Sequence, residues 1–325
     1  MSTFGRLFRI SIFGESHGKA VGVVVDGCPA GIDIDVNDFV ADMERRKPGA
    51  AGTTTRVEDD VPDIISGVFN GKTTGAPLTI LFENKNVRSA DYDTIKNTPR
   101  PGHADFVLHR KFKGFNDHRG GGHSSGRLTT ALVAAGVVAK KILGTVAIDA
   151  KLVEAGGKAD IEAAITNAVE KQDSIGGIVQ CNVIGLPLGI GEPFFDSVES
   201  AISHMVFAIP AIKGVEFGSG FGAAKMYGSE HNDAILNEKG TTKTNNAGGI
   251  NGGITNGNEL YFRVAVKPTS STPQVQHTWN EATKSVQDFQ VKGRHDLCIA
   301  LRVPVVVEAA AAIALADLLL INKAY

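Results

Sequence analysis

The stretch Gly120-Gly121-Gly122-His123-Ser124-Ser125-Gly126-Arg127 runs directly into residues 128–143, LTTALVAAGVVAKKIL. This second segment predicts a helix with Ala, Val and Leu on every side, and a helix that is apolar all round lies in the interior of a protein. The glycine-rich segment is therefore held at the N-terminus of a central helix. Its glycines let a bulky group approach the backbone, and N–H groups at a helix start bind anions.

A second motif, Arg100-Pro101-Gly102-His103-Ala104-Asp105, precedes this segment by a short basic connection. Arg100 and Arg127 supply fixed positive charges suited to planar or doubly charged anions, and His103 can carry a proton near neutral pH. Together the two motifs predict a site for a phosphorylated small molecule. Taken singly, each fits a flexible loop or a surface pair as well, and the glycine spacing matches neither the Walker nor the Rossmann pattern.

The composition favours a globular protein with one core. The chain has 325 residues, a formal net charge of -2, 42% hydrophobic residues and only 6% aromatic ones. A near-neutral charge argues against a nucleic-acid-binding protein that relies on a strong positive field. No linker-like shift in composition divides the chain, so we expect a single domain over residues 1–325.

The cysteines and the apolar segments point to a cytoplasmic protein with no membrane anchor. Cys28, Cys181 and Cys298 are far apart and form no Cys-x-x-Cys pair, so we expect free buried thiols and no metal site. The N-terminus lacks the apolar block of a signal peptide. Residues 303–321 are strongly apolar but include Glu308 and Asp317, and such charges are costly in a membrane helix. We expect a buried helix there.

Hydrophobic periodicity predicts a mixture of helices and strands along the whole chain. The expected strands are residues 8–13, 21–25, 64–69, 78–82, 146–152, 178–184, 213–217 and 260–266, and the expected helices are residues 35–46, 104–112, 128–143, 161–169, 198–208 and 303–321. Residues 64–69 and 78–82 are expected to pair through the turn at residues 71–75. Residues 218–257, rich in glycine and asparagine, are expected to form a long loop that is either functional or disordered.

Four segments together resemble the chorismate synthase family. They are Gly14-Glu15-Ser16-His17-Gly18, the Arg100–Asp105 motif, the Gly120–Arg127 segment and Gly293-Arg294-His295-Asp296, in this order. Ala247-Gly248-Gly249-Ile250 and Lys267-Pro268-Thr269-Ser270-Ser271 are also similar to that family, so the resemblance spans nearly the whole chain. It implies an α+β fold, a β-α-β sandwich around long central apolar helices, and a homotetramer.

The resemblance implies a shikimate-pathway lyase that converts 5-enolpyruvylshikimate 3-phosphate to chorismate by 1,4-anti elimination, with reduced FMN as cofactor. By resemblance His17 donates a proton to the departing phosphate, His103 faces the flavin, and Asp296 assists removal of the ring proton. The expected substrate-binding residues are Ser16, Arg46, Arg100, Arg127 and Arg294. The expected flavin contacts are His123, Ser124, Ser125, Gly252, Lys267, Pro268, Thr269, Ser270, Ser271 and Arg294.

The chain departs from the family pattern at a few positions. His123 stands where many members have Arg, so the charge there depends on pH. Gly52 stands where the family often has another Arg, and Arg56 is the nearest substitute. No extra segment suggests a built-in NADPH-dependent flavin reductase, so we expect an external reductase to supply reduced FMN. A catalytically silent phosphometabolite sensor, or an FMN enzyme with net redox chemistry, remains an alternative.

Overall fold

The computed structural model describes residues 2–54, 58–86, 95–291 and 295–324 of the chain. Helices and strands are mixed along the sequence, which confirms the expected combination of both. Two antiparallel sheets contain most of the strand residues, and three two-stranded hairpins contain the rest.

The first sheet has five strands in the order β1-β2-β3-β7-β4. Its strands are β1 (Thr3–Phe4), β2 (Arg9–Gly14), β3 (Ala20–Asp26), β7 (Leu78–Glu83) and β4 (Asp63–Ser66). Val21, Val23 and Val25 of β3 are fully buried. Because side chains alternate between the two faces of a strand, this spacing turns one face of the sheet toward the core.

The second sheet has four strands in the order β10-β13-β9-β8. These are β10 (Ile212–Phe217), β13 (Leu260–Val266), β9 (Gly177–Ile184) and β8 (Ala147–Ala155). Buried residues again alternate along the strands, most regularly in β13, where Leu260, Phe262, Val264 and Val266 face inward. This sheet also has one apolar face.

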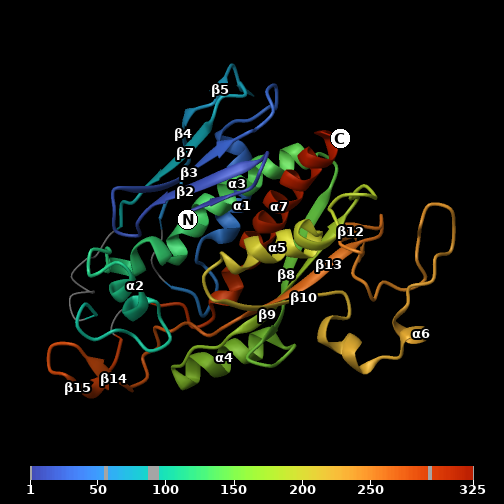
Figure 1. Cartoon of the computed structure of the whole chain (residues 1–325). Coiled ribbons are helices and arrows are strands. Elements are labelled where there is room, and N and C mark those ends of the chain that lie inside the picture. The colour runs from blue at the N-terminus through green and yellow to red at the C-terminus, as the bar shows by residue number, and fades with distance from the viewer. Residues whose placement is uncertain (1, 55–57, 87–94, 292–294, 325) are drawn as a thin grey trace.

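Helices α3 (Thr129–Leu143) and α7 (Pro304–Ala324) lie side by side between the two sheets (Figure 1). α3 packs against β3 and β7 of the first sheet, and α7 packs against β8 and β9 of the second. The two helix axes approach closely because Gly136 has no side chain: a Cβ atom there would lie 2.4 Å from the Cβ of Ala309. The expectation that both apolar helices are central is confirmed.

α7 is long and apolar enough to span a membrane, but 83% of its apolar window is buried inside the protein. Its two carboxylates are both hydrogen-bonded. Glu308 accepts hydrogen bonds from Arg45, Lys140 and the Ala150 N–H group. Asp317 accepts from backbone N–H groups at residues 6–8. Buried charges are tolerated when paired in this way, so α7 is a core helix, as expected.

The remaining elements surround these layers. α5 (Val198–Phe207) and α1 (Val40–Arg46) both pack against the central helices, and α4 (Ile161–Lys171) packs against β8. The remaining helices are α2 (Asp105–Lys111), α6 (Gly228–His231) and the 3₁₀ helices η1 (Val36–Phe39), η3 (Arg119–Ser124), η4 (Gly126–Leu128), η5 (Phe194–Asp196), η6 (Gly220–Lys225) and η7 (Ile299–Arg302). The hairpins are β5 (Val68–Phe69) with β6 (Lys72–Thr73), β11 (Ile250–Asn251) with β12 (Ile254–Thr255), and β14 (Gln276–Asn280) with β15 (Ser285–Phe289).

Two sequence predictions need correction. β4 does pair with β7, but Gly67 (φ +85°) comes directly after β4. Residues 68–69 then pair with residues 72–73 in the separate β5–β6 hairpin. Residues 218–257 are not one structureless loop, since they contain η6, α6 and the β11–β12 hairpin. The three cysteines are free and buried, as expected.

Candidate active site

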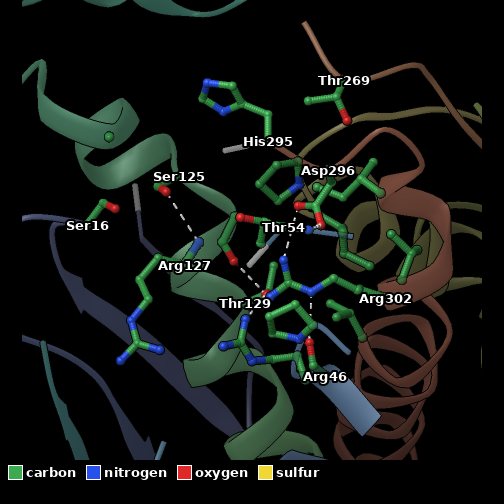
Figure 2. A pocket seen from close by; sticks show the side chains of 18 of the residues that line it. Ser16, Arg46, Thr54, Ser125, Arg127, Thr129, Thr269, His295, Asp296 and Arg302 are labelled. Atoms are coloured by element: carbon green, nitrogen blue, oxygen red, sulfur yellow. Dashed lines mark hydrogen bonds and ion pairs between the residues drawn. The ribbon is translucent and has the colours of Figure 1, made fainter. Parts of the chain in front are cut away.

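Two adjoining cavities lie near the first turns of α3 and α7. The first has a volume of about 230 Å³ and the second about 570 Å³. Ser125, Thr129, Thr269 and His295 line both of them, so the two cavities are parts of one site. Figure 2 shows the first cavity, with polar side chains converging from α1, α3 and the segment before α7.

The glycine-rich segment brings the backbone against the site. Gly120, Gly121 and Gly122 all have positive φ, which is accessible to glycine at little cost. Ser125 then begins η4, where its hydroxyl accepts a hydrogen bond from the Arg127 N–H group and satisfies a donor at the helix start. This local structure places Arg127 and Thr129 on the wall of the first cavity.

The first cavity contains four of the predicted catalytic and substrate-binding residues, Ser16, Arg46, Arg127 and Asp296. Arg46, at the end of α1, is 4% exposed, and Arg127 is 8% exposed. Burial lowers the pKa of Arg46 to about 10. Arg46 is therefore still a cation at neutral pH, and because few water molecules reach it, its attraction for an anion is weakly screened.

Asp60, which the sequence analysis did not single out, lies between the two buried arginines. Its Oδ2 accepts a hydrogen bond from Arg46 at 2.5 Å, and its Oδ1 accepts one from Arg127. Burial alone would raise the pKa of the Asp60 carboxyl, but the two guanidinium groups outweigh burial and lower the pKa below its usual range. Asp60 therefore stays ionised and fixes the two cations relative to each other.

Asp296 is also hydrogen-bonded on both oxygens. Its Oδ1 accepts from the Thr54 N–H group at 2.9 Å, and its Oδ2 accepts from Arg302 at 3.1 Å. Figure 2 shows Arg302 between Asp296 and Arg46, and the Arg302 Nε–H group donates to the Arg46 carbonyl at 2.9 Å. One arginine thus connects the carboxylate to the end of α1.

The second cavity contains most of the predicted flavin contacts. Its lining includes Arg100, His103, His123, Ser124, Ser125, Lys267, Thr269, Ser270 and Ser271. The Lys267 ammonium donates to the Ser270 hydroxyl at 2.7 Å, and that hydroxyl donates to the Gly102 carbonyl at 2.8 Å. These contacts join the Lys267–Ser271 segment to the Pro-Gly turn beside His103.

Arg100, His103 and Asp105 form one compact unit. Arg100 binds Asp105 through two nitrogens, each 2.8 Å from a carboxylate oxygen, and also donates to the Ser271 hydroxyl at 3.0 Å. His103 Nδ1 lies 2.7 Å from Asp105 Oδ1 and donates its proton there. Burial alone would raise the pKa of Asp105, but hydrogen bonds from Arg100 and His103 lower it well below its usual range. Nε2 of His103 is then left for a ligand.

His17 lies behind the glycine-rich segment rather than on either cavity wall. Its ring is so close to Gly120 that a Cβ atom there would lie 2.4 Å from His17 Cε1 and Nδ1 and 2.7 Å from Ser16 Oγ. The Ser16 N–H group donates to the Gly122 carbonyl at 3.1 Å. His17 is thus in close contact with Gly120, which lines both cavities.

His123 lines the second cavity and contacts two N-terminal segments. Its Nδ1 donates to the Gly14 carbonyl at 2.8 Å, and its Nε2 lies 2.9 Å from the Ser2 hydroxyl. Both ring nitrogens are therefore engaged. His123 thus joins the glycine-rich segment to the end of β2.

Besides His17, two other predicted residues are not brought to the cavities. Gly252 lies in the turn of the β11–β12 hairpin and lines neither cavity, and Pro268 flanks the second cavity without lining it. Arg294 and the proposed substitute Arg56 fall outside the described residues. The Gly52 carbonyl accepts hydrogen bonds from the Leu297 and Cys298 N–H groups, so this position connects the residue 47–54 loop to the Asp296 segment.

Six polar residues of the first cavity were missed from the sequence: Thr54, Glu58, Asp60, Thr129, His295 and Arg302. His295 was part of a quoted motif without an assigned role. Glu58 and Asp60 belong to an acidic run, which is usually a solvated surface, so only their burial identifies them. Arg302 is a charged residue directly before an apolar helix and only six residues after Asp296. This position in the sequence could have indicated that it belongs to the site. Within the described ranges no group of His, Cys, Asp and Glu is arranged to hold a metal ion.

Known proteins similar to this chain agree on one family. The family model described as chorismate synthase matches residues 8–320. A chorismate synthase of Chitinophaga pinensis is 64% identical over 324 residues, which is 99% of this chain and 98% of that protein. One of Dehalococcoides mccartyi is 45% identical over 351 residues, covering 98% of this chain and 96% of that protein.

A solved structure titled "Crystal Structure of Chorismate Synthase" has a TM-score of 0.76 to this fold at 27% identity, covering 98% of this chain and 93% of that one. The similarity therefore extends over both sheets, the central helices and the two cavities. Since the family model and the relatives each span almost the whole sequence, the chain belongs to the chorismate synthase family, lyases of the shikimate pathway.

Proposed function

We propose that the protein converts 5-enolpyruvylshikimate 3-phosphate to chorismate by 1,4-anti elimination of phosphate, with reduced FMN as cofactor. The observation that carries this proposal is the pair of joined cavities, one lined by buried arginines and the other by hydroxyls and histidines. A phosphorylated dicarboxylate suits the first cavity, since guanidinium groups bind such anions in fork geometry. A larger cofactor suits the second.

The arginine cavity supplies the anion-binding end. Arg46 and Arg127 are buried cations held at a fixed spacing by Asp60. A substrate phosphate or carboxylate that meets them exchanges water for donors already in place, which favours binding. Ser16 lies on the same wall, and by resemblance Arg294 and Arg100 complete the set.

The second cavity fits FMN by size and by its polar groups. Its volume is within the range of about 300–1,000 Å³ found for small-molecule sites. The Thr269 hydroxyl is buried at the junction of the cavities and has no hydrogen-bond partner among the described residues, so it is free to bind a ligand. Ser124, Ser125, Ser270 and Ser271 would hold polar groups of the cofactor, with Lys267 near its phosphate. Pro268 and Gly252 remain proposed flavin contacts by resemblance.

The proposed reaction breaks two bonds. The carbon–oxygen bond to phosphate breaks with the electron pair leaving on phosphate, and a ring carbon loses its proton, which creates the new double bond. His17 supplies the proton that eases phosphate departure, Asp296 accepts the ring proton, and His103, held by Asp105, stabilises charge beside the flavin. Reduced FMN, when bound, supplies an electron-rich partner for the allylic centre, with no net oxidation.

We also propose the wider setting that the family implies. The chain acts as one catalytic domain over residues 1–325, built as a β-α-β sandwich, in a cytoplasmic homotetramer. An external flavin reductase keeps FMN reduced, since the sequence indicated no distinct nicotinamide site.

Anaerobic incubation with substrate and either oxidised or dithionite-reduced FMN tests the proposal. Reduced FMN should support equal release of phosphate and chorismate, whereas oxidised FMN should bind without turnover. Asp296→Ala should retain flavin binding but react about 10²–10⁴-fold more slowly, the usual loss for an acid–base group. Substrate binding without any product would favour a silent sensor, and product formation with oxidised FMN would refute the proposed cofactor.

A further inference from the structure

Arg302 makes contacts that the proposed reaction does not yet use. It lies at the end of η7, two residues before α7 begins at Pro304, and its side chain is 19% exposed. One guanidinium nitrogen donates to Asp296 Oδ2 at 3.1 Å, and Nε donates to the Arg46 carbonyl at 2.9 Å. A single side chain therefore joins the proposed proton acceptor to the backbone of a proposed anion-binding residue.

The second contact of Asp296 makes this link specific. Its other oxygen accepts from the Thr54 N–H group at 2.9 Å, so the carboxylate is held from two directions. With a side chain only 10% exposed, Asp296 gains little support from water. Loss of the arginine would leave one oxygen of a buried carboxylate without its partner, and such a group reorients to recover a hydrogen bond.

We propose that Arg302 is a positioning residue for proton removal. It fixes the Asp296 carboxylate toward the first cavity and sets its distance from the anion clamp at Arg46, so that the ring proton meets Asp296 when the substrate anion is bound. This inference rests on the proposed function, in particular on Asp296 as the proton acceptor. Misplacement of a reacting group by about 1 Å can cost ~10²-fold in rate, which is the size of effect that Arg302 controls.

Two other roles for Arg302 lead to different results. If the guanidinium bound the substrate anion itself, its removal would weaken substrate affinity. If it only stabilised the fold, its removal would lower stability without changing the chemical step. Arg45 provides a matched comparison for the second case, because it also pairs with a buried carboxylate, Glu308 of α7, but lines neither cavity.

The experiment compares Arg302→Met, Arg302→Lys and Arg45→Met with the wild type, using substrate deuterated at the ring carbon that loses its proton. Arg302→Met should lower kcat by about 10–10²-fold and enlarge the deuterium isotope effect, since proton transfer becomes slower than the other steps. KM should change by less than about threefold, as for a group that acts in the chemical step rather than in binding. Arg302→Lys should restore part of kcat, and Arg45→Met should leave the isotope effect unchanged.

A double-mutant cycle with Asp296→Ala completes the test. Because Arg302 acts through Asp296, the double variant should be no slower than Asp296→Ala alone, a strong departure from additivity. Multiplicative losses, an unchanged isotope effect in Arg302→Met, or a tenfold rise in KM would overturn the inference. If Asp296→Ala itself reacted at the wild-type rate, the proposed role of Asp296 would fail, which is a separate result from normal kinetics in Arg302→Met alone.

Discussion

At the scale of single residues, Gly120 determines how close the chain comes to His17. It has φ of +57°, and a Cβ atom there would overlap the His17 ring and the Ser16 hydroxyl. Both the backbone conformation and the missing side chain are therefore required. Only glycine at position 120 lets the His17 ring lie this close to the backbone that lines the two cavities.

Gly120→Ala should consequently displace His17 and Ser16. We expect a loss of about 1–2 kcal/mol in the free energy of unfolding from the left-handed conformation, with a larger proportional loss in kcat than in FMN affinity. Chemical denaturation and steady-state kinetics measure both. Gly31→Ala is the matched control, since Gly31 also has a positive φ, +87°, but a Cβ atom there meets nothing within 4 Å. Wild-type kcat in Gly120→Ala would show that the close packing on His17 has no role in the reaction.

The two histidines should both affect the rate of the reaction and not the binding of its ligands. His17→Ala and His103→Ala are each expected to lower kcat by about 10²–10⁴-fold while retaining FMN and substrate, because the arginines and backbone donors remain. Titration of FMN fluorescence gives the affinities and stopped-flow absorbance the rates. His277→Ala, in the exposed β14–β15 hairpin, is the control. A variant that turns over as fast as that control has no such role.

Residue motifs predicted much of the site because several short segments carry unusual chemistry. Ser16, Arg46, Arg127 and Asp296 do meet in one cavity. Asp60 was not predictable, because its acidic neighbours suggest a solvated surface and its position between two arginines depends on segments far apart in sequence. Gly252 was expected at the flavin but lies in a distant hairpin, so its assignment stays a prediction.

At the scale of elements, α7 is held by the charges that interrupt its apolar sequence. Glu308 is 1% exposed and is bound by Arg45 of α1, Lys140 of α3 and the backbone of β8. Burial alone would raise the pKa of Glu308, but hydrogen bonds from Arg45 and the charge of Lys140 lower it. This carboxylate therefore connects both central helices to the second sheet.

Glu308→Gln should destabilise the protein by about 3 kcal/mol, near the lower end for loss of one partner of a buried pair, because Arg45 and Lys140 reach solvent. The pKa of Glu308 is lower in the folded protein than its unfolded value of about 4.3, so the ionised carboxylate stabilises the fold at any pH above about 4.3. This stabilisation is lost as the pH falls from there through the folded pKa. The difference between wild type and variant should thus be full near pH 7 and shrink below about pH 4. Urea unfolding across this range measures it, with exposed Glu238→Gln as the control; a pH-independent difference would exclude the ionised carboxylate as the cause.

The alternation of hydrophobic and polar residues, together with apolar content, predicted the strands and helices that face the core. The same signals did not predict the elements that face solvent. β13 and β9 have regular buried positions, and their sequences show the same period. The β14–β15 hairpin was missed because its strands are polar and mostly solvent-facing, so no hydrophobic period marks them. The break after β4 depends on Gly67, whose positive φ is not apparent from a single glycine.

At the scale of the whole molecule, the arrangement of the two sheets around α3 and α7 determines where the site forms. Both cavities lie at the ends of these helices where the N-terminal motifs and the segment before α7 meet. The sequence predicted two central helices, but not that β3 would pair with β7 or that β13 would lie between β10 and β9. Such pairings join distant residues, and local patterns do not specify them.

Assembly is a further prediction at this scale. We expect a homotetramer, from the family resemblance, and exposed aromatic side chains such as Phe195 and Phe221, 92% and 83% exposed, are suited to contacts between copies. Light scattering at micromolar protein should give the mass of four chains, with and without FMN. A mass of one chain in the presence of both FMN and substrate would contradict this expectation.

The central claim is that the joined cavities catalyse an elimination without net redox change. The most direct measurement is the number of chorismate molecules formed per molecule of reduced FMN, under anaerobic conditions, with cofactor limiting and no further reductant. The account predicts many products for each reduced FMN, with one phosphate released per chorismate and the flavin still reduced at the end. One product per reduced FMN, with oxidised flavin accumulating in step, would contradict it.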